Sequence, residues 1–174
     1  GDYYAAGQNS DGHVYTIAGI RDMAYSNSLI MRKDVLEAAG IDIDDINSID
    51  DITEMCATIK ETGAWDGPIL DFMNNLYYYD SVGSNNFGVI IDYENSLTVE
   101  NLFESEAFRE YCDYAREWYL AGYIDPEAAT SQDNSETKTA NGIICGYIMS
   151  NKPGMAQQET QATGYEMVAT DWGE

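Results

Sequence analysis

A chain of 174 residues is long enough for one globular domain with an apolar core, and 44% of these residues are hydrophobic. Acidic residues outnumber basic residues 31 to 8, which gives a formal net charge of −23. A surface this negative repels phosphate backbones, so we expect no nucleic-acid partner. No stretch approaches the roughly 18 consecutive apolar residues of a membrane helix.

The N-terminal part of the chain alternates strand and helix signals. An Asp11–Gly12 turn precedes strand-forming residues at 13–17, and residues 28–31 (SLIM) predict a second strand. A helix follows over 32–39, and Gly40 can end it. The sequence therefore begins with a turn, two strands and a helix.

Ser48 followed by Asp51 resembles a capping box and predicts the start of the next helix. Its apolar residues recur at helical spacing and should form one buried face: Ile52, Met55, Cys56 and Ile59. The stretch 63–96 is rich in Gly, Asn, Tyr and Asp, so it predicts loop with a short helix near 76–80 and a hairpin.

The longest predicted helix runs from Ser105 to Ala121, with Gly122 as its stop. One broad face of this helix carries its large apolar residues: Phe108, Tyr111, Cys112, Ala115, Trp118 and Tyr119. The register of Trp118 with this face favours a core position. Residues 125–130 (DPEAAT) predict another helix start, because Asp125 suits the N-cap and Pro126 the first helical position.

The C-terminal part returns to the same alternation. A short polar helix ending near Asn141, a strand over 144–149, a helix from Pro153 to Gly164 and a last strand over 165–170 complete the chain. Strands interleaved with helices predict an α/β fold with a small sheet covered by helices. We expect residues 1–174 to form a single such lobe.

Metal and redox chemistry find little support in the sequence. Cys56, Cys112 and Cys145 show no metal-ligand spacing, and their apolar neighbours predict buried, inert thiols. The acidic run 41–51 fails the EF-hand register, and the single histidine, His13, leaves little material for histidine-based catalysis. We expect no cofactor and no metal.

Four passages in order resemble the extracellular solute-binding proteins of carbohydrate ABC importers. They are DGHVYTIAG, NSLIMRKDVLEAAGID, SIDDITEMCATIKE and REWYLAGYIDPEAAT, and the tail from Asn141 to Val168 is also similar. The match corresponds to the second lobe of this periplasmic-binding-protein-like type II fold. The first lobe and the lipid-attachment cysteine of the family have no counterpart in the 174 residues.

This resemblance implies the function. The chain is expected to help capture an extracellular carbohydrate, of oligosaccharide size, between two lobes and to deliver it to a membrane permease. Its expected partners are the carbohydrate, the permease and the missing first lobe of the same polypeptide. The resemblance also implies a non-enzymatic lipoprotein held on the outer face of the cell membrane.

By the same resemblance, the loop over 21–27 should face the ligand, since ligands bind α/β sheets beyond the carboxyl ends of strands. Arg21 and Asp22 suit sugar hydroxyls, Tyr25 can stack, and Asn27 can make paired hydrogen bonds. An exposed polar loop is the alternative for these residues.

Two further groups are candidates for ligand contact. Tyr78 and Asp80 belong to the run LYYYD, whose three rings cannot all be buried on one helical face. Tyr147, Asn151 and Lys152 lie at the end of the late strand.

Two other classes of protein stay open as alternatives. A carbohydrate-active enzyme domain needs two carboxylates placed about the scissile bond, and 31 acidic residues offer many pairs without selecting one. No motif of a hydrolase, metalloprotease or nucleotide-binding enzyme occurs. A surface adhesion module is the second alternative.

Overall fold

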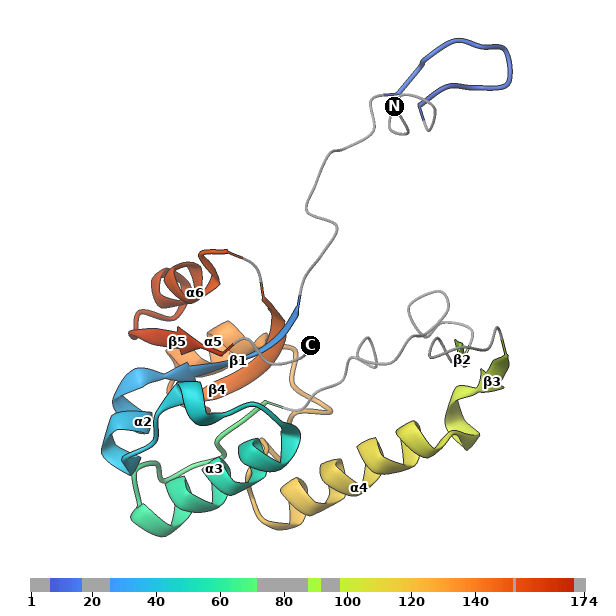
Figure 1. Ribbon diagram of the computed structural model, residues 1–174. Helices are drawn as coiled ribbons and strands as arrows, with labels where there is room; N and C mark the ends of the chain where they lie inside the picture. The colour runs from blue at the N-terminus through green and yellow to red at the C-terminus, as the bar shows by residue number, and fades with distance from the viewer. Residues whose placement is uncertain (1–6, 17–25, 72–87, 92–97, 152, 171–174) are drawn as a thin grey trace.

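The computed structural model describes residues 7–16, 26–71, 88–91, 98–151 and 153–170 (Figure 1). A three-stranded antiparallel sheet in the order β4–β1–β5 lies at its centre. β1 spans Ser26–Arg32, β4 spans Gly146–Asn151 and β5 spans Met167–Ala169. These strands confirm the predicted strands at 28–31, 144–149 and 165–170.

Helices cover this sheet, as the α/β prediction requires. Among the described residues, no helix is long and apolar enough to cross a bilayer. The helical segments and the second, two-stranded sheet have these bounds: α2 Lys33–Ala39, η1 Ile43–Asp45, α3 Ile49–Thr62, β2 Val89–Ile91, β3 Val99–Asn101, η3 Leu102–Glu104, α4 Glu106–Leu120, α5 Ser135–Ala140 and α6 Met155–Thr163.

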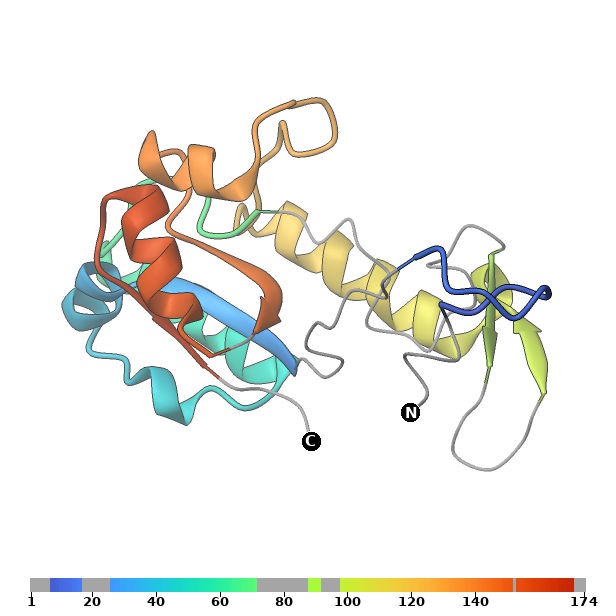
Figure 2. The same cartoon turned by 90° about the horizontal axis from the view of Figure 1, so that it is seen from above.

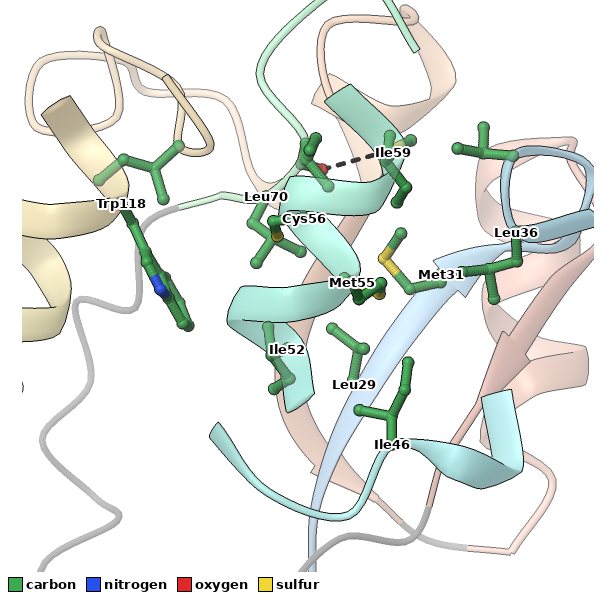
Figure 3. Packing of buried hydrophobic residues seen from close by; sticks show 14 residues of the cluster. Leu29, Met31, Leu36, Ile46, Ile52, Met55, Cys56, Ile59, Leu70 and Trp118 are labelled. Atoms are coloured by element: carbon green, nitrogen blue, oxygen red, sulfur yellow. Dashed lines mark hydrogen bonds between the residues drawn. The ribbon is translucent and has the colours of Figure 1, made fainter. Parts of the chain in front are cut away.

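The central strand β1 is buried on both faces because neighbouring side chains point to opposite sides of the sheet. Leu29 and Met31 join the larger apolar cluster, which α2 and α3 cover (Figure 3). Ile30 joins a smaller cluster on the other face, with Tyr147 and with Met155 of α6. Leu29, Ile30 and Met31 therefore form a continuous apolar run instead of an alternating one, as a strand covered on both faces requires.

The helix signals read from the sequence correspond to caps in the structure. The Ser48 hydroxyl accepts a hydrogen bond from the Asp51 amide at 3.1 Å, and the Asp51 carboxylate accepts one from the Asn47 amide at 2.9 Å. Gly40 ends α2 with φ of 72°, a left-handed conformation that costs other residues energy. The four α3 residues predicted to share one face are all buried.

A glycine lets β4 begin close to β1. A Cβ atom built at Gly146 would collide with the Met31 thioether and come within 2.8 Å of the Ile30 carbonyl oxygen. Any side chain at this position would separate the two strands where the sheet begins.

Helix α4 behaves differently from the other helices: it extends away from the sheet and carries the β2–β3 hairpin beyond its far end (Figures 1 and 2). Its C-terminal half is attached to α3. The Trp118 indole donates to the Thr53 hydroxyl at 2.9 Å, and the Tyr114 hydroxyl donates to the Asp50 carboxylate at 2.8 Å. The prediction that Trp118 is a core residue is confirmed, since it is 3% exposed.

Two predictions about this part of the chain are wrong. Cys112 is exposed, not buried, and the buried residue of its helix α4 is Trp118. Residues 126–130 form consecutive turns, not a helix. The Asp125 carboxylate does cap the Glu127 amide, at 3.0 Å, but the segment offers only small alanines as an apolar face, and so short a helix is marginal without packing.

The N-terminal segment 7–16 is described by itself. The Asp11–Gly12 turn is present, and a single antiparallel bridge joins Gln8 to Val14. The described part of the predicted strand, residues 13–16, contains only this bridge, and residue 17 lies outside the described residues.

Candidate ligand-facing edge of the sheet

One end of the central sheet collects the start of β1 and the ends of β4 and β5. Ser26 pairs with Asn151 at the junction of β1 and β4. On the other side of β1, the Thr170 amide donates to the Leu29 carbonyl at 3.1 Å. β4 and β5 both run antiparallel to β1, so their carboxyl ends point the same way. We call this candidate site the ligand-facing edge, because binding sites in α/β proteins commonly lie beyond the carboxyl ends of strands.

The sheet register brings two of the predicted contact residues to this edge although they are far apart in sequence. Asn27 pairs with Ser150, and Asn151 follows Ser150 directly. Asn27 is half-buried. The backbone thus places the first residues of β1 beside the last residues of β4.

The predicted contact residues number nine, and the structure describes three of them: Asn27, Tyr147 and the backbone of Asn151. The other six lie outside the described residues: Arg21, Asp22, Tyr25, Tyr78, Asp80 and Lys152. The backbone of Asn151 is described, but its side chain is not.

Tyr147 occupies the interior, where the sequence did not place it. Its residue exposure is 2%, and its ring belongs to the cluster with Ile30 and Met155. Burial raises the pKa of the Tyr147 hydroxyl, and its 2.6 Å hydrogen bond to the Glu159 carboxylate raises it further. Because it already has a partner within the lobe, we leave Tyr147 out of the ligand contacts.

Two side-chain hydrogen bonds hold the strands together next to the ligand-facing edge. The buried Ser28 hydroxyl donates to the Thr170 carbonyl, and the Thr170 hydroxyl donates to the Ile46 carbonyl at 3.0 Å. These bonds join β1, β5 and the segment between η1 and α3. Because these buried hydroxyls are hydrogen-bonded, they hold the neighbouring backbone of the edge in a fixed position, which is a property that binding sites need.

Buried charge fixes the two chain segments beside β4. Leu70 bridges in parallel to both Gly146 and Ile124, and an aspartate follows two of these three residues: Asp71 follows Leu70 and Asp125 follows Ile124. Lys138 of α5, which is 2% exposed, places its Nζ 2.8 Å from Asp71 and 3.1 Å from Asp125. Burial alone would lower the pKa of Lys138, but the hydrogen bonds to the two carboxylates outweigh it and raise the pKa.

The sequence analysis missed this ion cluster of Lys138, Asp71 and Asp125. Nothing about a lysine in the polar run SETKTA distinguishes it from a solvated one, and Asp125 was recognised only as a capping residue. The pairing depends on the parallel bridges at Leu70, which bring Asp71 and Asp125 to the same end of neighbouring segments.

Arg32, at the opposite end of β1, is also fully engaged within the lobe. Its guanidinium lies 3.6 Å from the ring centre of Tyr165 and 5.1 Å from that of Trp65. It also forms an ion pair with Asp34, whose hydrogen bonds raise the pKa of Arg32. Arg32 therefore joins the segments that follow α3 and α6.

Metal ligands and thiols were the remaining candidates for chemistry, and two of the three thiols, Cys56 and Cys145, are buried. No group of three or more His, Cys, Asp or Glu side chains among the described residues is arranged to hold a metal ion. Burial raises the pKa of Cys56 and raises that of Cys145 to about 12, so both thiols stay protonated near neutral pH.

The comparison with known proteins follows from this geometry. No family model matches the chain. A carbohydrate ABC transporter substrate-binding protein of Streptococcus pneumoniae is 26% identical over 134 residues, which cover 74% of this chain and 27% of that relative. Among solved structures, the N-glycan transport solute binding protein of S. pneumoniae in complex with Man1GlcNAc matches 99% of this chain with a TM-score of 0.74 and 20% identity. The chain has the fold of the carbohydrate solute-binding proteins.

Further solute-binding proteins share this fold at low sequence identity. An alginate-binding protein has a TM-score of 0.62 and 19% identity, and the match covers 94% of this chain and 35% of that protein. The S. pneumoniae substrate binding protein FusA in complex with kestose has a TM-score of 0.62 and 18% identity. The match covers 97% of this chain and 37% of FusA. The resemblance and the α/β fold predicted from the sequence are confirmed.

This chain spans only part of each of these solute-binding proteins. It covers about a quarter of the curated relative and 40% of the N-glycan transport protein. These two matched proteins are a substrate-binding protein and a solute binding protein.

Proposed function

We propose that this chain is one lobe of an extracellular solute-binding protein that captures a carbohydrate, of oligosaccharide size, for an ABC importer. The ligand lies between the ligand-facing edge and a first lobe of the same polypeptide, and the closed protein delivers it to a membrane permease. The complete protein is held on the outer face of the membrane by a lipid. The chain itself performs no chemistry on the sugar.

The observation that carries this proposal is the meeting of β1, β4 and β5 at one edge. The chain enters the lobe at Ser26 and completes its last strand at Ala169, beside Ile30 of the entering strand. A lobe with adjacent entry and exit can rotate as a unit about the two connections, which is how two-lobed binding proteins close around a ligand. The similarity to the proteins that bind Man1GlcNAc and kestose supports a sugar as the ligand.

The proposed contacts come from this edge and from residues near it in the sequence. Asn27 and Asn151 are there by register, and the loop residues Arg21, Asp22 and Tyr25 directly precede β1. Lys152 directly follows β4, and Tyr78 and Asp80 lie in the segment that continues from Asp71. Amide and charged groups pair with hydroxyls, and tyrosine rings cover the apolar faces of sugars.

The test is calorimetric titration of the longer polypeptide that contains this chain, with a panel of neutral oligosaccharides that includes kestose and Man1GlcNAc. Changing Asn27→Ala removes paired hydrogen bonds and should weaken binding about 10-fold, whereas Asn141→Ala, an exposed asparagine at the end of α5, should leave affinity unchanged. Equal affinities of the two variants would remove Asn27 from the site.

The 174-residue chain alone should bind the same sugar weakly. A ligand held between two lobes loses about half of its contacts when one lobe is absent, so a micromolar site falls to roughly 1 mM. We expect no dissociation constant below about 0.1 mM for the isolated chain. Micromolar binding by the isolated chain would contradict the two-lobe arrangement.

The enzyme alternative is tested with the same sugars. After prolonged incubation with each oligosaccharide, we expect no shorter saccharide by chromatography, because the site holds the sugar without a placed pair of catalytic carboxylates. Product formation that survives repurification of the protein would favour the carbohydrate-active enzyme.

A further inference from the structure

A surface hollow of about 390 Å³ lies between α2, η1 and the edge strand β5. None of the residues proposed to contact the sugar lines it. Its apolar lining consists of Leu36, Ile41, Ile43 and Val168. Two of these side chains, Ile41 and Ile43, are half-buried and pack against the larger apolar cluster from one side. The hollow therefore offers an aliphatic floor that is open to solvent.

The shape of the hollow follows from the end of α2. Gly40 adopts φ of 72°, and the Ile41 amide donates back to the Leu36 carbonyl at 3.0 Å. The chain then leaves the helix sideways and returns along η1, which the Asp42 carboxylate caps at the Asp44 amide. The two isoleucines lie on this return path, one on each side of Asp42.

Negative charge borders the aliphatic floor. Glu37 and Asp42 line the hollow and carry carboxylates. The single basic group of the lining, Lys33, is paired with Glu166 at 2.7 Å, and this hydrogen bond raises the pKa of Lys33. Because Lys33 is already neutralised by Glu166, the carboxylates of Glu37 and Asp42 remain as net negative charge at the rim.

We propose that this hollow, formed by α2, η1 and β5, is a docking site for a protein partner that inserts one aliphatic side chain flanked by lysine or arginine residues. The floor matches an aliphatic group, and the rim matches the flanking cations. A chain with a net charge of −23 also attracts such a partner over long range. The same charge disfavours an anionic lipid surface. This docking site is separate from the ligand-facing edge and does not depend on the proposed sugar capture.

The test uses two synthetic probe peptides and the 174-residue chain. One peptide is acetyl-Lys-Lys-Leu-Lys-Lys-amide, and the other replaces the leucine with serine. Binding is followed by the methyl NMR signals of Ile41, Ile43 and Val168. We expect saturable shifts confined to these methyls with the leucine peptide and at least about 10-fold weaker binding with the serine peptide, because the leucine side chain supplies the buried apolar area.

Charge variants separate the hollow from the general acidity of the chain. The double change Glu37→Gln with Asp42→Asn should weaken the leucine peptide about 5-fold and reduce the salt dependence of binding. The matched double change Asp113→Asn with Glu117→Gln removes two exposed carboxylates from α4 and should change neither. Thermal unfolding of each variant verifies that the fold is retained.

Three outcomes would overturn the proposal. They are the absence of binding by the leucine peptide, equal binding of both peptides with shifts spread over the acidic surface, and equal weakening by the two double changes. Loss of sugar binding in the longer polypeptide would leave these peptide results unchanged, so the two functions fail separately.

Discussion

The central lobe and the α4 arm, residues 98–120, differ in how far the apolar residues of their helices are buried. Both contain helices with a clear apolar periodicity. In the lobe, every predicted apolar position of α3 is buried against the sheet. In α4, Trp118 is the buried residue, whereas Cys112 and Tyr119 of the same predicted face are exposed. Periodicity thus identifies a helix, but burial depends on whether another element covers its face.

Polar groups follow the same division. In the lobe, buried charges are paired, as in the ion cluster around Lys138. In the arm, charged residues such as Arg109 and Asp113 face solvent. Substitutions of one residue type in the two regions therefore test the comparison directly.

The largest effect is expected for Lys138→Met. It leaves the carboxylates of Asp71 and Asp125 buried without their cation, which should lower the free energy of unfolding by about 3–5 kcal/mol. The control on the arm, Arg109→Met, should stay within about 0.5 kcal/mol. Urea unfolding followed by circular dichroism measures both. A cost below about 1 kcal/mol for Lys138→Met would mean that the cluster is solvated.

Leucine truncation gives the most closely matched pair. Leu29 in β1 is 0% exposed and Leu120 at the end of α4 is 70% exposed. Leu29→Ala should cost about 2–5 kcal/mol through lost burial and a cavity, and Leu120→Ala should change stability by less than about 0.5 kcal/mol. Similar costs in the same unfolding experiment would show that Leu120 is covered in solution.

The attachment of the arm to the lobe is tested at Trp118. Trp118→Phe keeps an aromatic ring but removes the hydrogen bond to Thr53, so it should cost about 1–2 kcal/mol. A double-mutant cycle with Thr53→Ala should give a coupling energy of about 0.5–1.5 kcal/mol. Strict additivity of the two changes would indicate that the hydrogen bond contributes nothing to docking the arm.

The smallest perturbation is chemical labelling of the cysteines, which leaves the fold intact. An aromatic disulfide reagent that reacts with free thiols should modify Cys112 promptly in the native protein, because this thiol is exposed. Cys56 and Cys145 are buried with raised pKa values, so they should react only as the lobe unfolds. Cys112→Ser should abolish the rapid phase. Prompt reaction of all three thiols would contradict the closed core.

Much of the fold could be predicted from local signals. The Ser48 cap, the glycine that ends α2 and the apolar run of β1 each act within a few residues, and each prediction is confirmed. The failure at 126–130 is also local in origin: a good cap with no apolar face gives turns instead of a helix. The sequence predicted an element correctly where the interactions that determine it lie within a few residues.

The candidate site depended on pairings that local signals do not contain. The sequence grouped Tyr147 with Asn151 by proximity along one strand. In the structure, Tyr147 faces α6 and donates to Glu159. Helix α6 determines the burial of Tyr147, and the bridges at Leu70 bring the aspartates of the ion cluster together. Neither arrangement can be predicted until the pairing of distant segments is known. The register also brings Asn27 beside Ser150, next to Asn151 at the end of β4, and this pairing of distant segments has no local signal.

The pairing of the end of β5 with β1, where Ala169 lies beside Ile30, also determines how the lobe responds to force. A load applied to the start of β1 and to the end of β5 acts on this antiparallel pair from the same end, so their hydrogen bonds open one after another, as in unzipping, instead of sharing the load as in shear. Strand pairs loaded in this way yield at low force. If the lobe is pulled through its two connections, we expect β5 to peel away from β1 first, while the pairing of β1 with β4 and the larger apolar cluster persist.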